Sequence, residues 1–383
     1  MPSQKNIFAK ICIPMLIFVV VLVVGCAPMV EREEYITVGA VFPLTGESAD
    51  AGLRGLNGLH LAKSEINESG GILGKKLDFI ILNDRGDKDH VVRQYHVLKE
   101  KEVVAIIGSI YSGVTLELAK AAAADGMPVI TPTASHSDIT KGRKNVFRTY
   151  FTDDYQGEVM AKFAYESLNV KTAVTFRSKT NDSFAQVADA TVKTFEECGG
   201  KVMAVEHYGS EEEFADILKK YTTNPPGAIF CPADYVPAAR LIHDAYEMGL
   251  RDTYLLGSDA WDGLLVYVTN MNSTKKVFYP VPFLFDDNTP AVAEFAQRFY
   301  ATFSHAPLTD AAAAYTCAYI VVEAIKKAGN TNAQDIVSAM KENEPDTILG
   351  RIKFDENNSP RVNVCIVQIK DGAYFTYKKI RGE

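Results

Sequence analysis

The sequence predicts an α/β fold of two lobes, each built on a parallel sheet with helices wound on both faces. Short apolar segments rich in β-branched residues alternate with segments of helical periodicity along most of the chain. Such alternation indicates βαβ units, whose right-handed crossovers give doubly wound sheets. The alternation occurs in two series, one beginning at about Tyr35 and the other at about Lys171. We therefore expect two α/β lobes with a cleft between them.

The first series alternates predicted strands with predicted helices. The strands are Ile36–Val41, Leu77–Leu82, Val103–Ile107 and Pro128–Thr131, and the helices are Asp50–Asn67, Asp87–Lys101 and Thr115–Ala124. In the first helix, Leu53, Leu56 and Leu59 recur at the spacing that gathers apolar residues on one face. The strands are continuously apolar, which is typical of parallel strands that are buried on both sides.

The second series repeats this pattern, and the end of the chain departs from it. The predicted strands of the second series are Lys171–Phe176, Lys201–Val205, Ala228–Cys231 and Tyr254–Leu256. The later part has predicted helices at Ala291–Phe303, Asp310–Lys327 and Ala333–Lys341, and predicted strands at Ile352–Phe354 and Val362–Ile369. By pattern alone, these late elements could pack on either lobe.

Length and composition fit a globular protein of two or three domains. The chain has 383 residues, and domains average ~150 residues. Hydrophobic residues make up 47% of the chain, which is sufficient for a buried core. The formal charge of −8 argues against nucleic acid as a partner, because surfaces that bind nucleic acid are basic. The six cysteines and seven histidines form no metal-binding motif, so we expect no metal.

The first residues have the pattern of a secretory signal that ends at a lipidation site. Lys5 and Lys10 precede an uncharged apolar run, Ile11–Gly25, which is shorter than the ~20 residues of a bilayer-spanning helix. The run ends in Val23-Val24-Gly25-Cys26, which resembles a bacterial lipobox.

We therefore expect residues 1–25 to be a signal peptide, Cys26 to carry the lipid and residues 26–34 to form a tether. The protein would then be held outside the cytoplasmic membrane, in the periplasm or at the cell surface, with the lipid as its only membrane attachment. The alternative is a retained N-terminal anchor helix.

Hydroxyl side chains follow two neighbouring predicted strands of the first lobe. Ile110, Tyr111 and Ser112 follow one strand, and Thr133 and Ser135 follow the next. Ligands of open parallel sheets bind outside the carboxyl ends of the strands. Hydroxyl groups and backbone N–H groups near helix starts suit a carboxylate or another small anion. The alternative is that these side chains only cap helices.

Acidic residues follow two predicted strands of the second lobe. Asp234 comes soon after Ala228–Cys231, and Asp259, with Ala260 and Trp261, comes soon after Tyr254–Leu256. A carboxylate in this position can bind an ammonium group. Donors on one lobe and acids on the other fit a zwitterion, and helix capping by both acids is the alternative.

Several segments occur in an order and spacing that is specific in combination. They are GAVFPLTG (39–46), EINESGGILG (65–74), IIGS (106–109), VITPTAS (129–135), FRT (147–149), Asp153 and Gln156-Gly157. With the lipobox, they resemble the branched-chain amino-acid-binding type of extracellular solute-binding lipoprotein, the periplasmic binding proteins of type I. The resemblance covers nearly all of the chain after the tether, from Ile36 to about Ile369.

The resemblance implies two Rossmann-like lobes joined by three hinge crossovers, which close on a ligand like a Venus flytrap. The first lobe would comprise residues 35–150 and 283–344, and the second 151–282 and 345–383. The crossovers would lie near Tyr150, near Tyr279–Phe283 and near Glu344–Leu349. The late helices would return to the first lobe and the last strands to the second.

The resemblance also implies roles for individual residues. Ser112, Thr133 and Ser135 would hold the carboxylate of an amino acid, and Asp259 would accept from its α-ammonium. Ile110 and Ala260, beside these positions in the chain, would also be ligand-binding residues.

The sequence departs from the family at several ligand positions. Asp234 stands where an aromatic hydroxyl is common. Ser183 or Phe184 stands where a tyrosine is usual, and Ala51 where a ring is often found. These departures leave open a larger, polar or cationic amino acid in place of leucine, isoleucine or valine. Tyr111 and Trp261 could supply replacement aromatic walls, and the alternative for Trp261 is simple packing.

As a member of this family, the protein would work without a cofactor, as a monomer that delivers its small-molecule ligand to an ABC permease. An enzyme is disfavoured, because the sequence has no GxSxG elbow, no phosphate-binding loop and no HExxH motif. The remaining alternative is a sensory protein that binds amides or aromatic acids. The lipobox favours the transport role.

Overall fold

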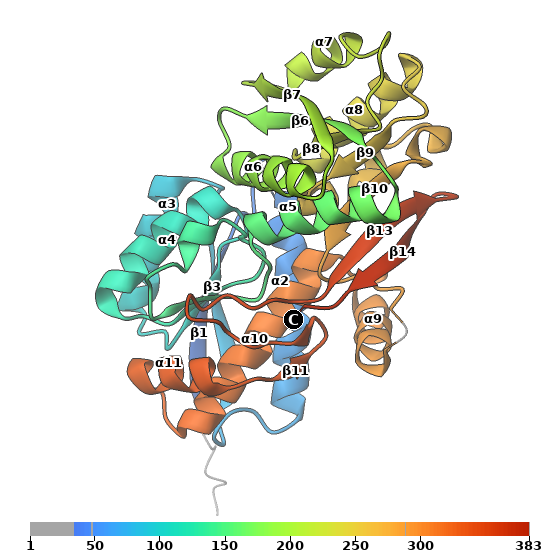
Figure 1. Ribbon diagram of the computed structural model, residues 1–383. Coiled ribbons are helices and arrows are strands. Elements are labelled where there is room, and N and C mark those ends of the chain that lie inside the picture. The colour runs from blue at the N-terminus through green and yellow to red at the C-terminus, as the bar shows by residue number, and fades with distance from the viewer. Residues whose placement is uncertain (1–33, 47–48, 288, 383) are drawn as a thin grey trace, which may run out of the picture. The chain divides into compact units, whose positions relative to one another are not determined.

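A five-stranded parallel sheet forms the first lobe (Figure 1). Its strands are β1 (Tyr35–Phe42), β2 (Lys76–Asn83), β3 (Ile106–Gly108), β4 (Val129–Thr131) and β5 (Val146–Arg148). Their order is β2-β1-β3-β4-β5, so the winding of the chain reverses between β1 and β3. Such a switch point is where open parallel sheets bind ligands. The loop that follows β3, which carries Ser112, lies at this point.

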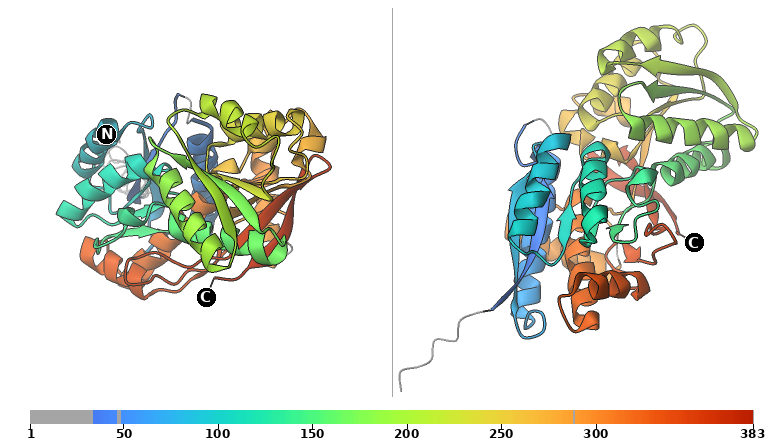
Figure 2. Two further views of the ribbon diagram at one scale, coloured as in Figure 1. Left: turned by 45° about the horizontal axis from the view of Figure 1, so that its top comes forward. Right: turned by 90° about the vertical axis from the view of Figure 1, so that its left-hand side faces the viewer.

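Helices cover both faces of this sheet (Figure 2). One face carries α2 (Ala49–Glu68), α10 (Thr309–Ala328) and α11 (Ala333–Glu342), and the other carries α3 (Lys88–Glu100) and α4 (Ser112–Asp125). Successive side chains of a strand point to opposite faces of the sheet. Accordingly, Ile107 packs in the core on the α10 side and Ile106 in the core on the α4 side. Helices α2 and α10 lie so close that a side chain at Gly58 would come within 2.1 Å of the Ala311 carbonyl oxygen.

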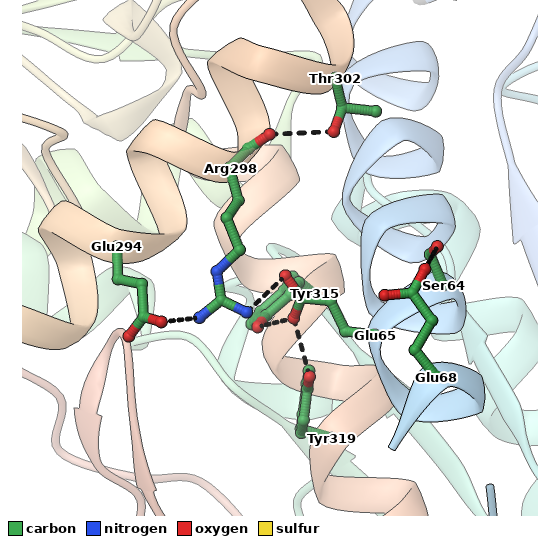
Figure 3. Close-up of polar contacts among 8 residues, drawn as sticks. All are labelled: Ser64, Glu65, Glu68, Glu294, Arg298, Thr302, Tyr315 and Tyr319. Carbon is green, nitrogen blue, oxygen red and sulfur yellow. Dashed lines mark hydrogen bonds and ion pairs between the residues drawn. The ribbon is translucent and has the colours of Figure 1, made fainter. Parts of the chain in front are cut away.

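Helix α9 (Pro290–Phe303) is joined to α2 and α10 by a polar cluster (Figure 3). Glu65 on α2 accepts hydrogen bonds from the hydroxyls of Tyr315, at 2.6 Å, and Tyr319, at 2.8 Å. Arg298 on α9 contacts the same carboxylate at 3.1 Å. The late helices therefore pack on the first lobe, as the resemblance implies.

A seven-stranded sheet forms the second lobe. Its strands are β6 (Thr172–Ser178), β7 (Lys201–Tyr208), β8 (Ala228–Cys231), β9 (Tyr254–Gly257), β10 (Val277–Val281), β13 (Val364–Lys370) and β14 (Ala373–Ile380). Their order is β14-β13-β10-β9-β8-β6-β7, and the last two strands of the chain run antiparallel at one edge. The prediction of two α/β lobes with parallel sheets is confirmed, apart from this antiparallel edge.

The helices of the second lobe follow its strands. They are α5 (Asp153–Lys162), which continues as η3 (Phe163–Ser167), α6 (Asp182–Glu197), α7 (Phe214–Lys219) and α8 (Tyr235–Glu247). Short turns of helix are η2 (Ser137–Ile139) in the first lobe and η4 (Glu211–Glu213), η5 (Asp259–Trp261), η6 (Leu264–Tyr267) and η7 (Met271–Thr274) in the second. The chain passes between the lobes after β5, after β10 and after α11. The finer lobe boundaries stay predictions.

The chain after α11 differs from the prediction of a strand at Ile352–Phe354. The chain instead forms a short hairpin of two strands with two residues each, β11 (Asp346–Thr347) and β12 (Gly350–Arg351). Phe354 makes only an isolated bridge with Pro360. The Phe354 ring packs against Phe147 of β5 with a centroid distance of 5.0 Å. The alternating apolar residues are therefore buried by packing of a loop on the first lobe, and not by strand pairing.

The computed structural model describes residues 34–46, 49–287 and 289–382. The predicted signal peptide, Cys26 and all of the tether except Glu34 lie outside the described residues. Within the described part, no helix has the length and apolarity needed to cross a membrane.

Candidate functional site

Two loops of the first lobe are tied together by Ser112. Ser112 is the first residue of α4, and its Oγ accepts hydrogen bonds from the backbone N–H groups of Ser135 and His136, both at 3.2 Å. Thr133 Oγ1 donates to the Ile110 carbonyl at 3.2 Å. The structure therefore brings together the hydroxyl residues that the sequence predicted at two strand ends.

A buried arginine holds the second of these loops in place. The guanidinium of Arg148 on β5 donates to the carbonyl oxygens of Ala134, at 3.1 Å, and His136, at 2.8 Å. Burial lowers the pKa of Arg148 to about 10, which still leaves it cationic at neutral pH. Arg148 touches the backbone of the loop, so it is a positioning residue for Ser135.

Asp153 links this loop to helix α5. Its backbone N–H donates to the Ser135 carbonyl at 3.0 Å, and its side chain is buried, with 1% exposure. Burial raises the pKa of the Asp153 carboxyl. Hydrogen bonds from the hydroxyls of Ser135 and Ser183 act in the opposite direction and lower it, as do the charges of His136 and Arg148. Among the described residues, Asp153 Oδ2 lacks a hydrogen-bond partner of good geometry.

Asp259 lies beside Asp153 at the end of β9. The Gln156 side chain joins the two, because its Oε1 accepts from the Asp259 N–H and its Nε2 donates to Asp153 Oδ1, both at 3.1 Å. Burial, and next the charge of Asp153, raise the pKa of Asp259 to about 7. Hydrogen bonds from Gln156, Tyr150 and the Ala260 amide oppose this rise. No lysine, arginine or histidine in the described part of the chain forms an ion pair with Asp259.

Asp234 is the residue before α8, but its side chain does not cap that helix. Its backbone is extended, with φ −69° and ψ 159°, and its carboxylate makes no hydrogen bond to the first turn. Burial, and next the charge of Glu211, raise the pKa of Asp234 to about 6. The alternative that Asp234 only caps a helix is therefore not supported. The same holds for Asp259, because the residue that precedes η5 is Ser258.

The structure places the other predicted residues as follows. Trp261 has 0% exposure, and its ring fills the space beside Gly257, where a Cβ would lie 2.1 Å from the indole. This burial favours the packing alternative for Trp261. Ile110 is buried with 5% exposure, while Tyr111, Ser183 and Ala260 are half-buried.

Sequence reasoning missed Asp153, Gln156 and Tyr150 as site residues. Asp153 and Gln156 were noticed only as parts of a family motif, and Tyr150 only as a crossover. The available signal was the position of Thr152, whose hydroxyl accepts from the Tyr155 N–H and starts α5 with Asp153 as its first residue. A helix that begins at a crossover presents its first residues to both lobes.

The described residues contain no candidate metal site and no disulfide bond. No group of three or more His, Cys, Asp or Glu residues there could hold a metal ion. Cys198, Cys231, Cys317 and Cys365 are free thiols.

Comparisons with known proteins agree with this architecture. The family model described as periplasmic binding protein matches residues 35–373. The Leu/Ile/Val-binding protein homolog 1 of Brucella suis biovar 1 (strain 1330) is 27% identical over 333 residues, which are 85% of this chain and 88% of the relative.

Two solved structures share the fold. The leucine-binding protein LivK of Thermotoga maritima MSB8 has a TM-score of 0.83 and 24% identity, and the match covers 90% of this chain and 99% of that one. A solute-binding protein of an ABC transporter from R. palustris, solved with benzoate, has a TM-score of 0.81 and 21% identity, with 90% and 96% of the two chains covered.

Proposed function

Because the chain belongs to the periplasmic binding protein family, which comprises solute-binding proteins and not enzymes, we propose that its ligand is an α-amino acid. In this proposal the ligand is captured between the two lobes and passed to the permease of an ABC importer. The family implies a location in the periplasm or outside the cell. Attachment through a lipid on Cys26, a monomeric state and the permease partner are parts of the proposal.

The observation that carries the proposal is the pair of carboxylates formed by Asp153 and Asp259. Burial, and next the negative charge of Asp153, raise the pKa of Asp259 to about 7. An ammonium group placed beside them would relieve this repulsion and occupy the free lone pairs of Asp153. Ser135 contacts Asp153 directly, so the donors for a carboxylate lie next to the acceptors for an ammonium. A zwitterion with both groups on one carbon fits this spacing.

Binding of such a ligand would couple to closure of the lobes. Ser112 and Ser135 belong to loops of the first sheet, whereas Asp259 follows a strand of the second. A ligand that contacts both sets has its highest affinity for the conformation that brings them together. Its binding shifts the population toward that closed form by the difference in affinity.

A second candidate is an aromatic acid or an amide, bound for transport or for sensing. The R. palustris relative of this fold was solved with benzoate. A carboxyl with a pKa of about 7 is partly protonated at neutral pH, and a protonated Asp259 would not repel an aromatic acid.

Titration calorimetry of the purified protein against amino acids, small amides and benzoate separates the candidates. An α-amino acid at 100 times its Kd should also stabilise the protein by ~2.7 kcal/mol, which is visible in thermal unfolding. Binding of an amino acid, with none of benzoate or amides, supports the proposal. Binding of benzoate or an amide with no response to any amino acid would overturn it.

A further inference from the structure

We propose that the ligand carries a second positive charge at the end of its side chain, and that Asp234 is the residue that selects it. The inference rests on the proposed function, because it names a class within the α-amino acids: those with a basic side chain. Asp259 would bind the α-ammonium and Asp234 the distal cation.

The position of Asp234 in the sheet supports a role in binding. In the second sheet β6 lies between β7 and β8, so the winding of the chain reverses between β6 and β8. The segments that follow these two strands flank the switch point. Asp234 lies in the loop after β8, and Ser183 is the second residue of α6, which follows β6. This is the place where a doubly wound sheet exposes its binding crevice.

The surroundings of Asp234 lack any group that would neutralise its charge. Among the residues that the structure describes, none donates a hydrogen bond to its carboxylate or forms an ion pair with it. Glu211 is the one charged group that shifts its pKa, and Glu211 is itself an acid. A half-buried carboxylate next to another acid is unfavourable until a cation arrives.

Two arginines of the described chain, Arg54 and Arg177, are paired with other acids. Arg54 lies over the ring of the adjacent Tyr235, 6.0 Å from its centroid, but its guanidinium binds Asp310 at 2.7 Å. Arg177 at the end of β6 binds both carboxylate oxygens of Asp189, at 2.7 and 2.8 Å. Neither of these two guanidiniums forms an ion pair with Asp234 in the described part of the chain.

Asp234 and Asp259 form two separate acceptors. They follow adjacent parallel strands, in which Cys231 pairs with Gly257. The two carboxylates have different neighbours: Gln156 joins Asp259 to Asp153, whereas Glu211 is the acid that acts on Asp234. Neighbouring strands are ~4.8 Å apart, and a straight side chain of a few carbons can extend from one strand end to the next.

The test compares ligands that differ only in the distal charge. Lysine and norleucine have side chains of the same length, and norleucine lacks the terminal ammonium. Titration calorimetry of the wild-type protein should give lysine at least a tenfold lower Kd than norleucine. Asp234→Asn should remove this preference by weakening lysine, with norleucine unchanged.

Asp216→Asn is the matched control, since Asp216 is in the same lobe, has 81% side-chain exposure and forms a surface ion pair with Lys219. It should leave both Kd values unchanged. Equal or tighter binding of norleucine by the wild-type protein would overturn the inference and leave the proposed function intact. A persistent lysine preference in folded Asp234→Asn protein would exclude Asp234 as its source. Failure of every amino acid to bind would overturn the proposed function itself.

Discussion

The side-chain oxygen of Gln156 accepts a hydrogen bond from the backbone N–H of Asp259 at 3.1 Å. The nitrogen of the same amide donates to Asp153, whose own N–H is bound to the Ser135 carbonyl. A continuous set of contacts therefore runs from a loop of the first sheet, through the start of α5, to a strand end of the second sheet. This set fixes the spacing between the two carboxylates.

Substitution Asp259→Asn should weaken amino-acid binding at least tenfold, about 1.4 kcal/mol. Asparagine keeps the shape of the side chain but cannot neutralise an ammonium. The Kd from titration calorimetry is the readout, with Asp216→Asn as a control for loss of one acid at an exposed position. Unchanged affinity in the Asp259 variant would remove this residue from the ammonium site.

Substitution Gln156→Leu should reduce both stability and affinity. The Asp259 N–H and one Asp153 oxygen lose their partner, and buried polar groups without partners cost about 1–3 kcal/mol each. Urea unfolding measures the free energy, and Gln297→Leu, at an exposed position on α9, is the matched control. If the two variants are equally stable and bind ligand equally well, the bridge has no energetic role.

Affinity for an amino acid should fall as the pH is lowered below 7. In the proposed binding mode the ammonium binds the ionised form of Asp259, and the raised pKa of about 7 means that protonation would compete with binding in this range. The expected loss approaches about tenfold per pH unit. Benzoate, which has no ammonium, should show the opposite trend. Calorimetry at pH 5.5, 6.5 and 8 tests this, and an equally steep loss in Asp259→Asn would assign the effect to another group.

The same pKa has a consequence for the protein without ligand. The pKa of Asp259 is higher in the folded protein than the ~3.9 of an unfolded chain, so between these values the folded state binds more protons. Its contribution to stability is therefore present at low pH and is lost as the pH rises from about 4 to 7. In Asp259→Asn protein, the unfolding free energy should lack this part of the pH dependence, and an unaltered profile would contradict the assignment.

Much of the fold could be predicted because burial leaves a pattern in the sequence. Strands β1, β8 and β9 are buried runs of apolar residues, and the predicted bounds agree with the observed ones to within about a residue at each end. The strands that the sequence analysis did not predict differ from these in length, in containing a proline, or in exposure. Strand β5 has three residues, β10 contains Pro280, and β14 alternates with polar residues on an exposed face.

The candidate site could be proposed from the sequence only where it depends on the ends of strands. Ser112, Ser135 and Asp259 could be selected because parallel strands end at one edge of a sheet. The role of Gln156 depends on a contact with a residue 103 positions away, which no local pattern encodes. The position of Trp261 likewise depends on the space that Gly257 leaves beside it.

Glu65 should be a determinant of stability that leaves ligand binding unaffected. Its side chain has 11% exposure and accepts from Tyr315, Tyr319 and Arg298, so Glu65→Ala leaves two partly buried hydroxyls without their partner (Figure 3). The expected loss in urea unfolding is about 1–3 kcal/mol. Glu68→Ala is the control on the same helix, because Glu68 is exposed and accepts a hydrogen bond from the exposed Ser64. A loss no larger than that of Glu68→Ala would show that the cluster does not hold α9 on the first lobe.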